Sequence, residues 1–443
     1  MRIYCRMRIL IFKKYWAMRK YIYYIAALAA TLFASSCSEM MNDALDAEVV
    51  APIKVAYKID IRNFTAPDGS AATAPADWYS NLEVVFNNFS EGIETNVKVG
   101  ADGVAMAEVI PGIYNITVRS TQKYNGKSYI INGLAQNVAL TEAVTSPSDK
   151  YAISIQPLLG SPLCIREMYY AGSLGGYFRD QFYEVYNNGE EVVYLDHICL
   201  AHLVPEYATT SLPEWPAEDG VDKYAYAVTL WQIKGDGDDY PLQPGESIVI
   251  AQEAADHTKI ETWAGFGIVD TSKVEWECWA GNEQRINEEV PDLPYVFWSG
   301  YINKMQWLTS VDGSAMALYQ PGQNLEFGSD YWQLGVTTQK KVGSGGQQYV
   351  RIPVGDIFDA VECIPTSADL DMKRIPGILD SGATSVDGYY NGKSVSRKVI
   401  DYREDGTPIF QDTNNSTDDF EVFDSPVIRR HDVKRPAWSP WAE

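Results

Sequence analysis

Two glutamates stand inside apolar stretches where a charge is costly, so they are the first candidates for chemistry. Glu184 lies in "QFYEVYN" and Glu167 lies in "CIREMYY". Alternation along a strand gives Glu184 the same face as the aromatic residues two positions away on either side. A carboxylate buried there must be paired, because an uncompensated buried charge is very unfavourable. We predict a structural ion pair for Glu184 with Arg374 or Arg397, and the alternative is a catalytic or metal-binding pair with Glu167.

Local catalytic motifs give no support for an enzyme. The chain has four histidines, at His197, His202, His257 and His431. None of them forms a metalloprotease motif or a nucleophile arrangement, and neither a P-loop nor a dinucleotide fingerprint is present. Two dispersed carboxylates need no local motif, so an exported hydrolase that uses carboxylates or a divalent cation stays an alternative.

One acidic turn could supply oxygen ligands to a cation. "KGDGDDYP" places Asp236, Asp238 and Asp239 on a Gly-rich turn, and carboxylate oxygens are the ligands that Ca²⁺ prefers. The spacing lacks the closing glutamate of a calcium-binding EF-hand loop. Ca²⁺ is therefore the one cofactor that we consider, and a solvated turn is the alternative.

Aromatic side chains are concentrated between about residues 205 and 342. Eight tryptophans fall there: Trp215, Trp231, Trp263, Trp276, Trp279, Trp298, Trp307 and Trp332. Flat aromatic faces bind sugar rings and hydrophobic ligands, but tryptophan is also a good core residue. We take Trp276, Trp279 and Trp298 as the candidate ligand-binding residues, with core packing as the alternative.

The N-terminus reads as an export signal. Residues 1–36 carry seven basic residues and no acid, then the apolar run "YIYYIAALAATLFA" before "SSC". A start at Met18 would give a signal of ordinary length. "FASSC" resembles a relaxed bacterial lipobox of the kind common in Bacteroidota, which implies acylation of Cys37. Acyl chains would anchor residues 37–50 as a tether to the outer membrane.

The net charge limits the classes of ligand and partner that the chain can bind, and the cysteine spacing argues against a zinc site. Without the signal, 29 Lys and Arg remain against 59 Asp and Glu, a formal net charge of −30. Such a field repels nucleic acid and favours cations, neutral sugars or a basic partner. Cys164, Cys199, Cys278 and Cys363 lack zinc-site spacing, and we expect buried free thiols.

The pattern beyond the tether is all-β, with two β-sandwich domains. Residues 51–160 alternate in short runs that are separated by Gly, Asn and Pro turns. Residues 161–435 continue in the same way, with a Trp-rich insertion at about 205–342, and residues 436–443 form a tail. Asn-Asn-Gly at 187–189 predicts a β-hairpin between the strands on either side of it.

Several of these motifs resemble known families. "ADGVAMAEVIPGIYNITVRS" is similar to prealbumin-like and carboxypeptidase-regulatory-like sandwiches, which implies turns at Asp102-Gly103 and Pro111-Gly112 and a core position for Tyr114. "CIREMYY", "FYEVYNN" and "YPLQPGESIVIAQEA" resemble the lamin-tail-like sandwich. The succession of "IPVGDIFDAVEC", "KRIP", "LDSG" and "DTNNSTDDF" resembles a family of Bacteroidota lipoproteins known as domain-of-unknown-function family 4876. That family implies no established activity.

These observations together favour a lipid-anchored envelope protein that binds a ligand without catalysing a reaction. We expect it at the outer membrane, on the cell surface in preference to the periplasmic face, and with a glycan or other small ligand. Exported Bacteroidota lipoproteins often work with TonB-dependent receptors, so such a receptor is the partner that we expect. No residue of this sequence indicates that partner directly. A structural or adhesive surface protein is a further alternative.

Overall fold

The computed structural model describes residues 50–88, 90–220, 222–281, 287–299, 307–327, 336–338 and 348–442. Residues Ile53–Glu443 form one compact unit. No helix among the described residues is long and apolar enough to cross a membrane. The predicted signal, Cys37 and most of the predicted tether lie outside the described residues.

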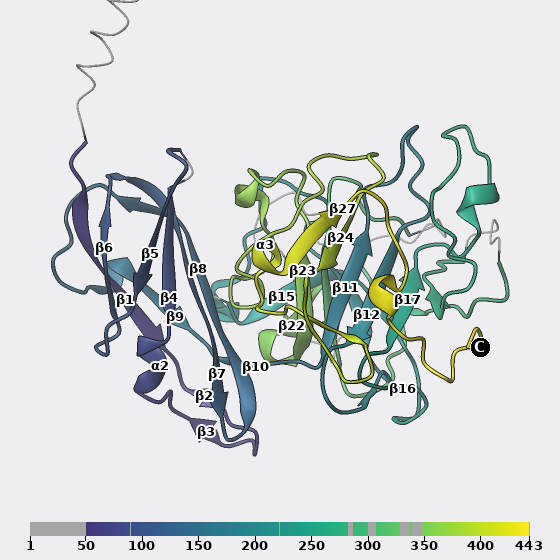
Figure 1. Cartoon of the computed structure of the whole chain (residues 1–443), viewed down its shortest axis with the longest axis horizontal. Helices are drawn as coiled ribbons and strands as arrows, with labels where there is room; N and C mark the ends of the chain where they lie inside the picture. The colour runs from purple at the N-terminus through teal and green to yellow at the C-terminus, as the bar shows by residue number, and fades with distance from the viewer. Residues whose placement is uncertain are drawn as a thin grey trace, which may run out of the picture. The chain divides into compact units, whose positions relative to one another are not determined.

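The N-terminal part is a sandwich of two sheets, drawn in purple and blue (Figure 1). The smaller sheet has the order β6-β1-β9, with β1 at Ile53–Ile61, β6 at Val104–Val109 and β9 at Ala152–Ile155. The larger sheet has the order β10-β8-β7-β4-β5, with β4 at Glu83–Asn88, β5 at Ile93–Lys98, β7 at Gly112–Tyr124, β8 at Lys127–Leu140 and β10 at Leu158–Leu159. A hairpin of β2 (Phe64–Thr65) and β3 (Ala71–Ala72) and the short helix α2 (Asp77–Ser80) complete this part.

The two sheets enclose one apolar core to which both contribute. Tyr57 of β1 and Phe86 of β4 meet edge to face with ring centroids 5.8 Å apart. Tyr114 is buried, as the resemblance implied, and its hydroxyl donates to the Ile110 carbonyl oxygen at 2.7 Å. Gly103 has a φ of 76°, which glycine adopts without strain, so the predicted Asp-Gly turn can connect β5 to β6.

The C-terminal part is a second sandwich. One sheet has the order β18-β17-β12-β11-β24-β27, with β11 at Leu163–Tyr169, β12 at Phe182–Asn187, β17 at Ser247–Ala251, β18 at Trp276–Glu277, β24 at Ser394–Arg397 and β27 at Phe420–Phe423. The other has the order β21-β22-β15-β14-β20-β23, and β19 (Tyr295–Trp298) also pairs with β15. Its strands are β14 at Cys199–Leu203, β15 at Tyr224–Gln232, β20 at Ala315–Tyr319, β21 at Val336–Thr338, β22 at Gln348–Pro353 and β23 at Ile357–Glu362.

The largest core lies between these two sheets. Ile165 and Val185 come from the first sheet, and Leu200, Trp231 and Leu318 come from the second. The stretch that we expected to be an insertion supplies β15, β17 and β20, so it is part of the sandwich itself. Cys164, Cys199, Cys278 and Cys363 are buried free thiols, as predicted.

Two more two-stranded sheets flank the sandwich, β13 (Val193–Tyr194) with β16 (Pro241–Leu242) and β25 (Val399–Tyr402) with β26 (Pro408–Phe410); α3 spans Ser416–Asp419. The predicted Asn-Asn-Gly hairpin is wrong, because β12 pairs with β11 and β17 while β13 pairs with β16. Side-chain hydrogen bonds from Asn187 to the Glu191 and Leu242 carbonyl oxygens draw the chain away from β12 after the turn.

Glu184 is fully buried and ion-paired, but with a different arginine from those we predicted. Arg166, also fully buried, contacts Glu184 and lies 3.0 Å from the Glu167 carboxylate. The backbone N–H of Arg429 donates to Glu184 at 2.9 Å, and that of Val427 donates to Glu167 at 2.9 Å. Burial alone would raise the pKa of Glu184, but the Arg166 guanidinium outweighs it and holds that pKa below its ordinary value.

The two arginines that we predicted for Glu184 bind other carboxylates. Arg374 pairs with Glu362 at 2.8 Å. Arg397 makes two hydrogen bonds of 2.8 Å to Asp359 and also lies 3.2 Å from Asp412 and from Asp419. Since both guanidinium groups are already compensated, neither is available to Glu184.

Replacing Arg166 by methionine is expected to lower the free energy of unfolding by about 3–5 kcal/mol, because two carboxylates would lose their shared buried cation. Urea unfolding followed by tryptophan fluorescence measures this. Lys58→Met, which breaks the exposed pair with Asp149, is the control and should leave the unfolding midpoint unchanged. Equal midpoints for both variants would contradict a structural role for Arg166.

Candidate functional site: an exposed aromatic loop surface

The three tryptophans chosen from the sequence are not the exposed ones. Trp276 is buried and packs against Tyr240 and Trp438. Trp298 is half-buried against Trp231, and Trp279 is half-buried as well. Core packing, the alternative that we considered, therefore applies to Trp276. Trp279 and Trp298 are partly packed in the same way.

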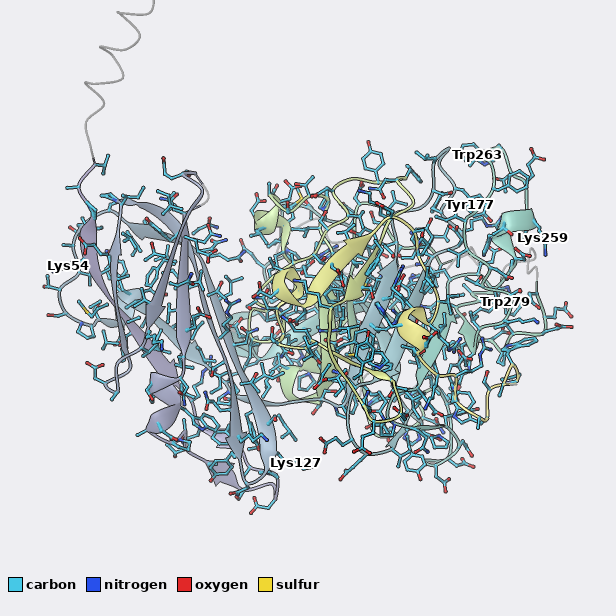
Figure 2. The ribbon with its side chains drawn as sticks, viewed as in Figure 1. Lys54, Lys127, Tyr177, Lys259, Trp263 and Trp279 are labelled. Atoms are coloured by element: carbon cyan, nitrogen blue, oxygen red, sulfur yellow. The ribbon has the colours of Figure 1, made fainter. Side chains whose placement is uncertain are left out.

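A tryptophan from the same region is instead almost fully exposed. The relative solvent accessibility of Trp263 is 92%, that of Leu174 is 82% and that of Tyr389 is 60%. Figure 2 shows Trp263 at the edge of the molecule, above Tyr177 and near Lys259. We call the group of exposed apolar side chains on the three adjoining loops the loop surface: Leu174, Trp263, Phe266, Ile268 and Tyr389.

The first loop joins β11 to β12 and carries Leu174 at its tip. The backbone N–H of Ser173 donates to the Tyr177 carbonyl oxygen at 2.7 Å, which closes a tight turn. Gly175 has a φ of 98°, and a Cβ there would lie 2.6 Å from the Ala264 carbonyl oxygen. Glycine is therefore required where this loop touches the second loop.

The second loop follows the 3₁₀ helix η3 (His257–Lys259) and presents Trp263 on a turn. Thr262 and Gly265 exchange backbone hydrogen bonds of 3.0 Å, and the Thr262 hydroxyl accepts from the Ala264 N–H at 3.1 Å. The Ser173 hydroxyl donates to the Phe266 carbonyl oxygen at 3.2 Å, which ties this loop to the first. The indole is thus exposed on a hydrogen-bonded frame.

The third loop precedes β24 and carries Tyr389. It is fastened to the first loop by backbone hydrogen bonds from Tyr390 to the Ala171 carbonyl oxygen at 2.6 Å and from Gly392 to that of Gly172 at 2.9 Å. The Tyr390 ring lies 5.7 Å from that of Tyr389, edge to face. Three segments far apart in sequence therefore form one surface.

A layer of buried polar groups supports the first two loops. The Tyr177 hydroxyl lies 2.6 Å from His257 Nδ1, and His257 Nε2 lies 3.0 Å from the Glu253 carbonyl oxygen. Asp180 accepts from the Ile268 N–H at 2.8 Å. Burial lowers the pKa of His257 to about 4 and raises that of Asp180 to about 6, so near neutral pH the imidazole is uncharged.

An ion pair anchors the first loop beside this layer. Arg179 makes two hydrogen bonds to the Glu253 carboxylate, of 2.7 and 2.8 Å. Burial raises the pKa of Glu253 to about 7 although the Arg179 guanidinium opposes the rise. The pair fixes the end of the first loop to the strand edge after β17.

The charges on these loops are mostly negative. Glu261, Asp270 and Asp387 are exposed. Of the lysines, Lys259 is ion-paired with a neighbouring aspartate at 2.6 Å and Lys393 is half-buried. An acidic border around apolar side chains repels polyanions and accommodates neutral ligands.

The acidic turn that we considered for Ca²⁺ is organised by another side chain. Asp196 accepts from the backbone N–H groups of Gly237 and Tyr240 at 3.0 and 3.1 Å, while Asp239 accepts from that of Asp236 at 2.8 Å. Within the part of the chain that the structure describes, no group of three or more His, Cys, Asp or Glu side chains is arranged to hold a metal. Calcium binding by Asp236, Asp238 and Asp239 stays a prediction.

The sequence contained a signal for this surface that the tryptophan count obscured. Turn tips are normally polar, yet "SLGG", "TWAG" and "GYYNG" each place a large apolar residue inside a Gly-containing turn. Leu174, Trp263 and Tyr389 are those residues. What the sequence could not show is that the three turns adjoin.

The fold and these loops define an all-β protein of two sandwiches with an apolar loop surface. The chain belongs to the family described as protein of unknown function DUF4876, whose model matches residues 243–427. A crystal structure of a DUF4876 family protein from Bacteroides thetaiotaomicron VPI-5482 is 34% identical, with 88% of this chain and 99% of that chain covered and a TM-score of 0.58.

A second solved structure, a DUF3823 family protein from Parabacteroides merdae ATCC 43184, is 10% identical over 45% of this chain and 80% of that chain. Its TM-score of 0.15 is too low to bear on the fold. No curated protein matches the chain.

The neutral state of His257 predicts a pH dependence of stability. Because its pKa is lowered from 6.5 to about 4 on folding, its contribution is full above pH 6.5 and is lost as the pH falls through 4. Relative to His257→Gln, the wild type should lose about 3 kcal/mol of unfolding free energy between pH 7 and pH 3.5. The comparison with His257→Gln is needed because protonation of Asp180 acts in the opposite direction.

Urea unfolding at a series of pH values, with an NMR titration of the imidazole, measures this effect. A pKa of His257 near 6.5 in the folded protein would contradict the buried arrangement.

Proposed function

We propose that this protein is a cell-envelope lipoprotein that binds neutral glycans at the loop surface without catalysing a reaction. The observation that carries the proposal is the exposure of the Trp263 indole and of Tyr389 on loops that are joined by hydrogen bonds. Exposed apolar groups of this kind on a soluble domain usually mark a binding site. Flat aromatic rings fit the apolar faces of sugar rings, and the acidic border leaves neutral sugars as the favoured class.

The structure does not favour the alternative of a hydrolase that uses Glu167 and Glu184 as its catalytic carboxylates. Both carboxylates are fully buried and shared by Arg166, and backbone N–H groups occupy them further. A substrate has no access to them in this arrangement. Binding is therefore the function that the described residues support best.

Anchoring at Cys37 would place this surface outside the membrane. The export signal and the lipobox-like "FASSC" support attachment to the outer membrane, with the cell surface favoured. A glycan held there would serve uptake through an outer-membrane TonB-dependent receptor.

Glycan binding should depend on Trp263. Affinity electrophoresis of residues 38–443 in gels that contain neutral polysaccharides, after a glycan array has chosen them, measures it. Trp263→Ala should weaken binding about 10- to 100-fold, since burying an aromatic side chain against a ligand is worth roughly 1.5–3 kcal/mol. Tyr389→Ala should weaken it as well.

The matched control is Tyr207→Ala, because Tyr207 is 61% exposed and lies outside the three loops. It should leave retardation unchanged. Retardation that survives Trp263→Ala, or a folded protein that binds no glycan on the array, would rule the proposal out.

Lipid attachment has its own test. Cells that express the full chain and are fed a labelled fatty acid should label the protein, and Cys37→Ser should abolish the label because the thiol is the acylation site. Met41→Leu, just beyond the anchor, should leave labelling intact. A label that persists in Cys37→Ser would show that anchoring does not use this cysteine.

A further inference from the structure

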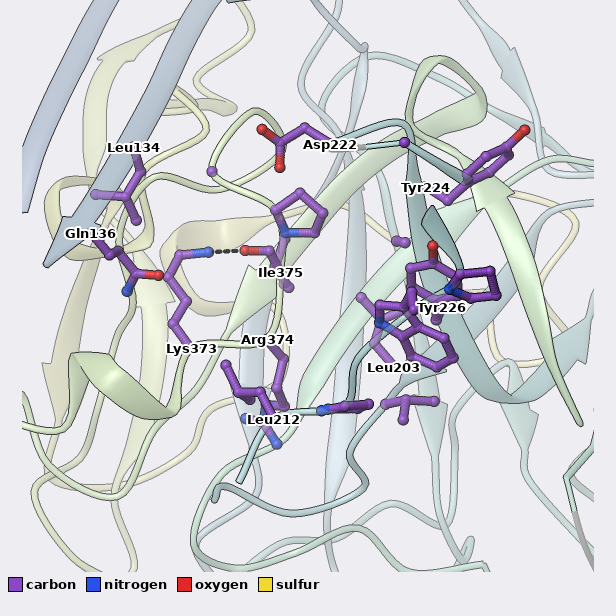
Figure 3. Close-up of a pocket in the computed structure, with 18 of the residues that line it drawn as sticks. Leu134, Gln136, Leu203, Leu212, Asp222, Tyr224, Tyr226, Lys373, Arg374 and Ile375 are labelled. Atoms are coloured by element: carbon purple, nitrogen blue, oxygen red, sulfur yellow. Dashed lines mark hydrogen bonds between the residues drawn. The ribbon is translucent and has the colours of Figure 1, made fainter. Parts of the chain in front are cut away.

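A cavity away from the loop surface has the features of a small-molecule site. Its volume is about 570 Å³, within the range of ligand pockets. One wall is apolar and aromatic, with Trp215 stacked on Tyr226 at a centroid distance of 3.6 Å and an interplanar angle of 7°. Leu203 and Leu212 also line it, and Figure 3 shows Tyr226 across the cavity from Lys373.

Two groups of opposite charge face this cavity. Lys373 is only 4% exposed, and its ammonium donates one hydrogen bond, to the Ile375 carbonyl oxygen. The other charged group is the half-buried carboxylate of Asp222 (Figure 3). Among the described residues, neither Lys373 nor Asp222 has an ion-pair partner, and the Asp222 carboxylate accepts no hydrogen bond.

The neighbouring arginine, by contrast, has a direct ion-pair partner. Arg374 also lines the cavity, but Glu362 compensates its guanidinium at 2.8 Å. Two of the three donors of Lys373 are left for another acceptor. Burial lowers the pKa of Lys373 although the nearby carboxylates of Asp380, Glu362 and Asp222 oppose the shift. Burial raises the pKa of Asp222 although Arg62 and Lys373 oppose that shift. The cost of burying each charge is therefore only partly offset.

We propose that this cavity binds a small zwitterion, an amino acid or short peptide with an apolar side chain. The ligand carboxylate accepts from the Lys373 ammonium, and the ligand ammonium donates to Asp222. The apolar side chain lies against Leu203, Leu212 and the Trp215–Tyr226 stack. Such a ligand gives Lys373 and Asp222 each a direct ion-pair partner at once, whereas a simple anion would be repelled by Asp222 and a simple cation by Lys373.

Isothermal titration calorimetry on residues 38–443 tests this, with L-phenylalanine and the dipeptide Phe-Leu as probes. We expect saturable binding of at least one of them. N-acetyl-phenylalanine, which lacks the ammonium, and phenylalaninamide, which lacks the carboxylate, should each bind at least tenfold more weakly.

Variants assign the binding to the cavity. Asp222→Asn and Lys373→Met should each weaken it at least tenfold, while Asp238→Asn, on an exposed turn, should not change it. If Lys373→Met fails to fold, Asp222→Asn and the two analogues in the wild type decide the matter. Trp263→Ala should leave zwitterion binding intact, so this result does not depend on glycan binding at the loop surface.

Three outcomes would overturn the proposal. They are no heat with either zwitterion, a blocked analogue that binds as tightly as the zwitterion, and zwitterion binding that Asp222→Asn leaves unchanged. Heat from neutral mono- or disaccharides that disappears in Asp222→Asn would assign the cavity to a polyhydroxylated ligand and would overturn it as well.

Discussion

The buried carboxylates of Glu167 and Glu184 require a cation, and the C-terminal sandwich is arranged to supply one. The two residues lie directly opposite each other on β11 and β12, where like charges repel. A bulge between Ile165 and Glu167 breaks the alternation of β11, which leaves Arg166 and Glu167 together on the face of the sheet away from the main core. Without that extra residue, Arg166 and Glu167 would point to opposite faces.

The same pair of carboxylates fixes the C-terminal segment to the sheet. Backbone N–H groups of Val427 and Arg429 bind them, and the Arg429 side chain continues to Glu275 at 2.7 Å. Further along, Trp441 donates to the Val274 carbonyl oxygen at 2.9 Å. The last residues therefore form a cover over one face of the sheet, which explains why a strand with glutamate at its centre is buried on both sides.

Sequence patterns predicted the fold class and the faces of β12, because alternation and turn composition are local properties. Tyr183 and Val185 face the core between the sheets and Glu184 faces the other side, as alternation requires. The partner of Glu184 was not predictable in the same way. Composition does not reveal where a strand has a bulge. Arg374 and Arg397 form ion pairs with carboxylates that are distant in sequence from Glu184.

The tryptophans show the same division between local and non-local information. Composition indicated the region that contains the exposed tryptophan but not which tryptophan is exposed, since burial of Trp276 depends on Trp438 near the end of the sequence. Trp263 is exposed because Thr262 and Gly265 close a turn around it, and Gly175 lets a second loop support that turn.

The hydrogen bonds among the loops determine whether the Trp263 indole stays exposed. A flexible loop would fold the ring back onto the protein, since burial of apolar area is favourable and few contacts would oppose it. Here the hydrogen bonds among the loops, and the buried Tyr177–His257 pair beneath them, hold the ring away from the core before any ligand arrives. The entropy of ordering the loops is lost on folding and not on binding, so contact with a ligand can appear directly as affinity. The formal net charge of the full sequence, −23, opposes association of such a surface with copies of itself.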